Sequence, residues 1–168
     1  MKTVYWGLIV LWALCAGCGP KLPDGLPSLV KVQALLTYDD GTPVDDAHLS
    51  FISQTGKNSW TFGGKTDAQG KLQLRTQGTY EGIPEGDYKV LIRKSIKEGI
   101  PEPPEPMDEE SRNAYQKWSN SPNKEKVYST VDLAYRQEAK TPLAVKIDSN
   151  TKNIELKAGK KVKILSDM

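Results

Sequence analysis

Two cysteines are the residues of this chain whose type and spacing most directly suggest chemistry. Cys15 and Cys18 form a C-x-x-C sequence, and the 168 residues include 2 cysteines in all. Such a pair serves in thiol redox chemistry beside a βαβ unit, or as half of a zinc site that has a second ligand pair. Neither context is present, because the pair instead ends an apolar run, 4–16, that follows Lys2. A positive start, an apolar run and small residues before a cleavage site are typical of a secretory signal.

The small residues directly before Cys18 resemble the lipobox of bacterial lipoproteins. That family has an aliphatic residue three places before the lipidated cysteine, whereas this chain has Cys15 there and Leu14 one place earlier. The resemblance implies that residues 1–17 are removed and that Cys18 carries acyl chains such as palmitate, which anchor the protein in the cell envelope. Gly19, in place of the aspartate that signals inner-membrane retention, favours the outer membrane. The apolar run is shorter than the roughly 20 residues that a membrane-spanning helix needs.

His48 is the single histidine of the chain, and nothing nearby in the sequence gives it a catalytic partner. It alternates with Leu49 and Phe51, so we expect it on the solvent side of a strand. A metal or catalytic role would need a second histidine or a free cysteine. Serines such as Ser59 and Ser111 therefore have no base except His48, which argues against a serine hydrolase.

Four aspartates gather around one turn, where their oxygens invite comparison with a calcium site. Calcium takes six to eight oxygens in a loop of defined spacing, and no D-x-D-x-D-G spacing is present. Turn formation already explains these residues, because an aspartate side chain bonds its own backbone two residues on. We expect no metal site, no cofactor site and no catalytic group. The aspartates are Asp39, Asp40, Asp45 and Asp46.

The overall charge gives no reason to expect nucleic acid or an acidic polymer as a partner. The chain has 23 Lys and Arg against 21 Asp and Glu, a net charge of +2. Lys157, Lys160, Lys161 and Lys163 are close together, and a charged edge strand or tail explains them. After signal removal and acylation of Cys18, the domain has no cysteine pair and folds without a disulfide.

Residues 18–28 are rich in Pro and Gly and are predicted to be a lipidated tether. Beyond them, apolar residues recur at every second position, as in half-buried strands, and clusters of Asp, Gly and Pro separate the alternating segments. This pattern predicts an all-β, antiparallel sandwich of about seven strands. The segments are 30–38, 47–53, 60–64, 72–76, 88–92, 143–147 and 154–156.

Residues 96–141 interrupt the alternation and are expected to be a Pro-rich, partly helical insertion before the last strands. Residues 101–106 alternate Pro with Glu and favour an extended polyproline conformation. A short helix is predicted to begin at Asp108 as its cap and to end before Pro122. An insertion of this length in a small domain is either functional or mobile.

Tyr115 and Trp118 fall on one face of this predicted helix, together with Met107 and Ala114. Two interpretations remain open. The rings belong to a partner-binding surface, because large amphipathic side chains anchor interfaces. Alternatively, the helix covers one end of the sandwich and buries the rings in the core.

Three short segments resemble carboxypeptidase regulatory-like domains and lie in the order of that family. Residues 41–47 (GTPVDDA) match its G-x-P-V-x-x-A opening, 64–70 (GKTDAQG) its G-x-T-D-x-x-G turn, and 83–90 (IPEGDYKV) its l-p-x-G-x-Y-x-V strand. The resemblance implies a transthyretin-like Greek-key sandwich over residues 29–168. It does not imply one function, because members of the family do many different things.

The expected function is a lipid-anchored, non-catalytic envelope protein that acts as a structural or protein-binding module. Hydroxyisourate hydrolase, the enzyme known on a transthyretin-like fold, uses several histidines and ends Tyr-Arg-Gly-Ser, whereas this chain ends at 165–168 with LSDM. One alternative is a cell-surface carbohydrate-binding module in which Trp60 and Phe62 stack on a sugar. The other is a small hydrolase, which would need His48 beside a serine and a carboxylate.

We predict that Cys18→Ala leaves the domain folded and releases it from the membrane, because the acyl chains attach at this sulfur. Fractionation of cells that express the variant measures this, with a palmitate label on the parent protein as the control. Continued membrane association of the variant would contradict the lipid anchor.

Overall fold

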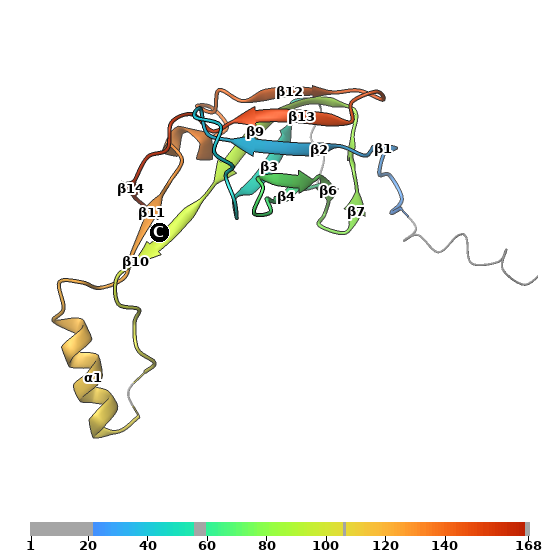
Figure 1. The fold of residues 1–168 in the computed structure, drawn as a ribbon. Helices are drawn as coiled ribbons and strands as arrows, with labels where there is room; N and C mark the ends of the chain where they lie inside the picture. The colour runs from blue at the N-terminus through green and yellow to red at the C-terminus, as the bar shows by residue number, and fades with distance from the viewer. Residues whose placement is uncertain (1–21, 56–59, 106, 167–168) are drawn as a thin grey trace, which may run out of the picture.

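The computed structural model describes residues 22–55, 60–105 and 107–166 (Figure 1). The signal and the lipidated Cys18 lie outside these residues. The chain is 40% strand and 11% helix, with several antiparallel sheets, so the prediction of an all-β protein is confirmed. Within the described ranges, no helix is long and apolar enough to cross a bilayer.

Two sheets pack around one hydrophobic core and form what we call the body (Figure 1). The larger sheet has six strands in the order β12-β9-β3-β4-β6-β7, and the smaller has three in the order β13-β2-β5. The larger sheet comprises β3 (His48–Ser53), β4 (Phe62–Lys65), β6 (Arg75–Thr76), β7 (Tyr80–Glu81), β9 (Gly86–Arg93) and β12 (Ala144–Ile147). The smaller comprises β2 (Gln33–Thr37), β5 (Lys71–Gln73) and β13 (Asn153–Lys157).

The remaining elements lie outside these two sheets. β1 (Leu29–Val30) pairs with β8 (Ile83–Pro84). A third sheet has the order β10-β11-β14, with β10 (Ser95–Glu98), β11 (Lys126–Ser129) and β14 (Ile164–Leu165). Helix α1 (Glu109–Ser119) lies between β10 and β11 in the chain, and a 3₁₀ turn, η1 (Leu133–Arg136), follows β11. We call residues 95–129 the arm, because Figure 1 shows them leaving one end of the body with α1 at the far tip.

The alternation of apolar residues accounts for the core, because successive side chains of a strand point to opposite faces. Ala34 and Leu36 of β2 are buried, while the intervening Leu35 is half-exposed. At the centre of the core, the Tyr88 ring lies edge-on to Phe51 and Phe62, with centroids 6.3 and 5.7 Å apart. The buried apolar residues are Val32, Ala34, Leu36, Tyr38, Val44, Ala47, Leu49, Phe51, Phe62, Leu72, Leu74, Ile83, Tyr88, Val90, Ile92, Val131, Ile147, Leu156 and Ala158.

Two segments expected as single strands are each divided between two sheets. Segment 72–76 contributes β5 to the smaller sheet and β6 to the larger. The chain changes sheets at Leu74, which is fully buried and whose backbone bonds Val32 and Gly82 instead of continuing either strand ladder. Segment 30–38 divides in the same way, with β1 beside β8 and β2 beside β5.

The expectation of an entirely antiparallel sandwich is wrong at one pair, because β13 runs parallel to β2. β12 belongs to the larger sheet, and the turn after it carries the chain across to the smaller one. The chain therefore enters β13 at the end where β2 begins, and Gln33 N donates to the Lys152 carbonyl over 2.9 Å. Parallel pairing follows from this crossing between sheets.

Thr66 joins the end of β4 to the loop before β3 through a buried hydroxyl. Its Oγ1 donates to the Val44 carbonyl over 2.7 Å and accepts the Ala47 amide over 2.8 Å. Thr66 has 5% of its surface exposed, so water cannot replace its hydroxyl as the hydrogen-bond partner of these two backbone groups.

We predict that Thr66→Val lowers the free energy of unfolding by about 1–3 kcal/mol, because it leaves a buried donor and acceptor unpaired without opening a cavity. Urea denaturation of the protein that begins at residue 19, without the signal and Cys18, measures this. The matched control is Thr61→Val just before β4, whose exposed side chain should change stability by less than about 0.5 kcal/mol. Equal stability of the two variants would contradict the proposed role of the hydroxyl.

Candidate functional site

The arm is a twisted β-hairpin that extends from the longest strand of the body. β9 ends at Arg93, and β10 begins at Ser95. Lys94 lies between them with 8% of its surface exposed, and its Nζ lies 3.3 Å from an Asp45 carboxylate oxygen. Because a buried ammonium needs an anionic partner, this pair holds the backbone where the chain leaves the body.

The base of the arm is fastened by Arg136 of η1. Its Nη1 donates to Ser166 Oγ over 2.7 Å, and its Nη2 donates to Ser95 Oγ over 3.1 Å. Burial, with the nearby Arg93 charge, lowers the pKa of the Arg136 guanidinium. One side chain therefore connects the start of β10 to the residue that follows β14.

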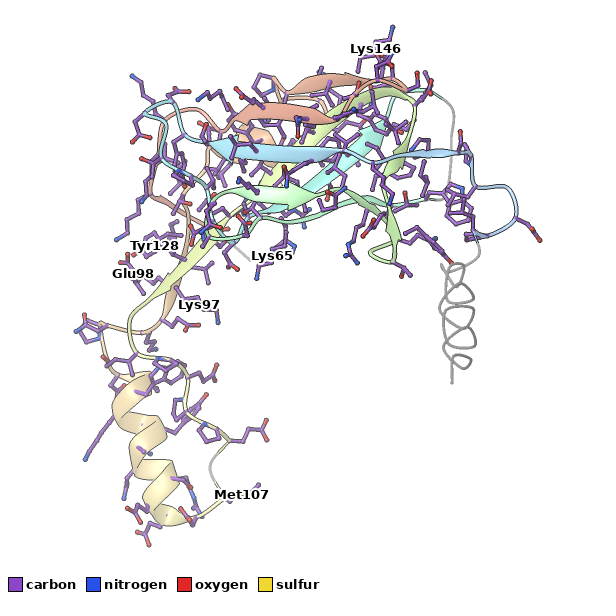
Figure 2. The ribbon with its side chains drawn as sticks, turned by 45° about the vertical axis from the view of Figure 1, so that its right-hand side comes forward. Lys65, Lys97, Glu98, Met107, Tyr128 and Lys146 are labelled. Carbon is purple, nitrogen blue, oxygen red and sulfur yellow. The ribbon has the colours of Figure 1, made fainter. Side chains whose placement is uncertain are left out.

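Ion pairs continue along the hairpin, and Figure 2 labels one member of each, Lys97 and Glu98. Lys97 Nζ lies 2.9 Å from Glu125, and Lys163 Nζ lies 2.6 Å from Glu98. The Lys163 ammonium is also 4.6 Å from the centroid of Tyr128, and its bond to Glu98 raises its pKa. These pairs are solvent-exposed, so they contribute little to stability and mainly select the register of the hairpin.

The tip of the arm begins where the hairpin ladder ends. Ile100 N donates to the Asn123 carbonyl over 2.7 Å, and Glu125 N donates to the Ile100 carbonyl over 2.9 Å. Gly99 has a φ of +112°, and a Cβ there would lie 2.5 Å from the Lys124 carbonyl oxygen. Glycine is therefore required where the two strands separate to admit the helix.

Asp108 is the N-cap of helix α1, as predicted. The carboxylate of this cap accepts the Ser111 amide over 2.7 Å, and the Ser111 hydroxyl accepts the Asp108 amide over 3.0 Å, which completes a capping box. The bonds to Ser111 lower the pKa of Asp108. The helix ends at Ser119, before Pro122.

Tyr115 and Trp118 hold the helix against the proline-rich segment of the tip. Trp118 Nε1 donates to the Ile100 carbonyl over 2.9 Å, and the Tyr115 hydroxyl donates to Glu102 over 3.3 Å. The charge of Glu102 raises the pKa of Tyr115. The two ring centroids lie 5.4 Å apart, and the Lys124 ammonium lies 5.3 Å from the Trp118 ring.

The interpretation in which α1 covers one end of the sandwich is wrong. None of its residues is buried, and Tyr115 and Trp118 are absent from the core. Both figures place the helix beyond the end of the hairpin, away from the two sheets. Its partly buried rings pack within the tip, and the expected partner contact through them stays a prediction.

The arm also carries exposed apolar residues, of which the sequence pattern singled out Met107 but not Ile100. Ile100 is 49% exposed, and Met107, at the tip in Figure 2, is 94% exposed. On the neighbouring β14, Leu165 is 53% exposed and lies in one cross-strand row with Tyr128 and Ile96. The alternation of side chains in 95–98 and 126–129 is the sequence feature that could have predicted β10 and β11. Each segment has only four residues, and charged residues interrupt its apolar pattern.

The other candidate residues lie apart from the arm and from one another. His48 is exposed on β3, as predicted, opposite Lys65 and Arg93. Asp46 pairs with Lys65, which lowers the pKa of Asp46. Among the described residues, no group of three His, Cys, Asp or Glu side chains is placed to hold a metal.

Trp60 and Phe62 do not form an exposed pair for sugar stacking. Phe62 belongs to the core with 4% of its surface exposed, and Trp60 packs against that core partly buried. A sugar-stacking platform needs an exposed face on each of its rings.

The aspartate cluster forms a turn. Asp40 accepts the Thr42 amide over 2.8 Å, and this bond lowers the pKa of Asp40.

Comparisons with protein-family models, with curated proteins and with solved structures found no match to this chain.

We predict that Trp118→Phe loosens the tip without weakening the body, because the phenylalanine keeps the ring and removes the donor to Ile100. Hydrogen exchange in residues 100–124 should become faster, while the free energy of unfolding changes by less than about 0.5 kcal/mol. Gln116→Ala, an exposed change on the same helix, is the control. A loss of global stability in Trp118→Phe would contradict the separation of tip and body.

Proposed function

We propose that this protein is a non-catalytic lipoprotein of the bacterial envelope, anchored at Cys18 and favouring the outer membrane, whose arm docks to a protein partner. The body is a seven-stranded, transthyretin-like Greek-key sandwich of the carboxypeptidase regulatory-like type. Two observations support this fold. The two sheets of the body share one core, and seven of their strands have three or more residues.

The observation that carries the docking role is the self-contained structure of the arm. Its tip is held by its own cap, backbone bonds and ring contacts, and it projects from the body (Figure 1). An ordered projection of this kind places Ile100 and Met107 in solvent, where a protein surface can cover them. Holding the tip in one conformation also reduces the entropy lost on binding.

The proposed anchor agrees with this geometry. The tether leads into β1, which lies at the opposite end of the body from the arm (Figure 1). Residues 22–28, the described part of the tether, and the tip therefore lie at opposite ends of the body. A lipid anchor that precedes residue 22 would be joined to the end of the body that is distant from the arm.

Photo-crosslinking in cells tests the docking role. A photoreactive residue replaces Met107 at the tip or Lys146 on the far side of the body (Figure 2). We expect the tip position alone to crosslink to one discrete envelope polypeptide. Excess purified protein from residue 19 should compete this crosslink away.

A protein with a shortened arm is the matched competitor. Replacing residues 101–123 with Asn-Gly closes the hairpin with a two-residue turn and leaves every strand of the body intact. Provided that its unfolding curve matches the parent, this protein should not compete. Equal crosslinking at Met107 and Lys146, or equal competition by the shortened protein, would overturn the proposal.

A further inference from the structure

The outward side of the six-stranded sheet carries an open hollow of about 230 Å³, separate from the arm tip. Gly63 of β4 lies in its lining, paired with Ser50 on one side and Arg75 on the other. Gly63 has a φ of +143°, and a Cβ there would lie 2.0 Å from the Leu49 carbonyl oxygen. Only glycine fits there, because the Leu49 backbone of β3 occupies the place of a side chain, and the buried Gly63 lets β3 and β4 approach closely at the base of the hollow.

The hollow is lined by hydrogen-bonding side chains, namely His48, Ser50, Thr61 and Arg75. Among the described residues of the lining there is no carboxylate. These side chains offer a guanidinium, an imidazole and two hydroxyls over a small area. Such a mixed set suits a ligand that carries both an anionic group and hydroxyls.

Arg75 is free to bind an anion. The carboxylate of its cross-strand neighbour Glu81 is paired with Lys31, whose Nζ lies 3.2 Å from Glu81 Oε2. The guanidinium makes one long bond, from Nη1 to the Gly78 carbonyl over 3.4 Å. In the part of the chain that the structure describes, no ion pair involves Arg75.

A row of basic side chains adds positive charge beside the hollow. Lys65, His48 and Arg93 occupy one cross-strand row on β4, β3 and β9, and Figure 2 shows Lys65. Like charges opposite one another destabilise a sheet, and within the described ranges only Lys65 of this row has a carboxylate partner, Asp46. The near-neutral total charge of the chain therefore conceals a basic sheet face.

We propose that this hollow binds one acidic sugar unit of a carboxylate-bearing glycan. Arg75 would pair with the sugar carboxylate, since a guanidinium matches a carboxylate in two parallel hydrogen bonds. Ser50, Thr61 and His48 would exchange hydrogen bonds with ring hydroxyls. The volume lies below the roughly 300 Å³ at which pockets for drug-sized ligands begin, so a single sugar ring suits it better than a large cofactor.

Two other anionic partners fit less well. Single-stranded nucleic acid needs exposed aromatic rings for stacking, but Phe62, the one aromatic residue of the lining, is 4% exposed. A lipid surface is broad and is recognised by larger clusters of lysine and arginine, whereas this hollow is concave and has Arg75 alone as a fully charged basic group in its described lining.

Binding of tetragalacturonate to the protein from residue 19, followed by NMR, tests the proposal. The matched ligand is fully methyl-esterified tetragalacturonate, which has the same rings without the charge. We expect the acid form alone to shift the amides of Gly63, Gly64 and Gly78. Shifts by the ester of equal size, or shifts confined to other residues, would overturn the assignment.

Variants identify the binding groups. Arg75→Gln should weaken binding about tenfold, the loss expected for one charge-assisted contact, and the exposed His48→Gln should weaken it less. Lys97→Gln on the arm removes the same charge far from the hollow and should leave the affinity unchanged. If Lys97→Gln weakens binding as much as Arg75→Gln does, the net charge alone explains the effect, and the proposed binding site is contradicted. Binding to phosphatidylglycerol vesicles without binding to tetragalacturonate would replace the glycan with a lipid surface.

Discussion

The burial of β9 is the constraint on which the rest of this structure depends. β9 pairs with β3 on one side and β12 on the other, and its inward residues occupy the centre of the core. Tyr88 contacts two other rings, and its hydroxyl donates to the Pro84 carbonyl over 2.8 Å. Burial raises the pKa of Tyr88 to about 12, so this hydroxyl stays protonated and remains a donor across the physiological range. β9 determines where the arm lies, because β10 continues in the direction of β9 after Lys94.

The arm and the body are stabilised by different kinds of interaction. The body depends on apolar burial between sheets, which is the main favourable term in folding. The tip depends on a cap, backbone bonds and two aromatic rings, all from residues close in the sequence. Such a local unit opens without the rest of the molecule, as contiguous low-stability segments do. This separation lets a surface that projects into solvent change without a cost to the fold.

Charge in this protein is balanced in number but not in space. Acidic groups near the turns form ion pairs with lysines, as Asp45 does with Lys94 and Glu81 with Lys31. Glu98 and Glu125 are similarly paired along the arm. On the outward face of the large sheet, Arg75 and His48 line the hollow, and Arg93 lies opposite His48 on β9. A balanced composition therefore does not describe the potential that a ligand meets at one face.

The sequence by itself determined the features that depend on neighbouring residues. Alternation predicted which side of β2, β3 and β9 is buried, because side-chain direction in a strand is set by the backbone from one residue to the next. Asp108 predicted the start of α1 for the same reason, since a cap bonds an amide only three residues away. The exposed position of His48 also followed from its place in the alternation.

Only the tertiary structure decided which strands meet and what lies between them. The division of segment 72–76 between two sheets, the parallel pairing of β13 with β2 and the projection of α1 each depend on partners distant in the chain. The hollow lies where the pairing of β3, β4 and β6 brings Ser50, Gly63 and Arg75 side by side. Short-range patterns encode the conformation of a segment, whereas these contacts arise from the packing of the whole chain, in which burial selects one pairing among several that are locally possible.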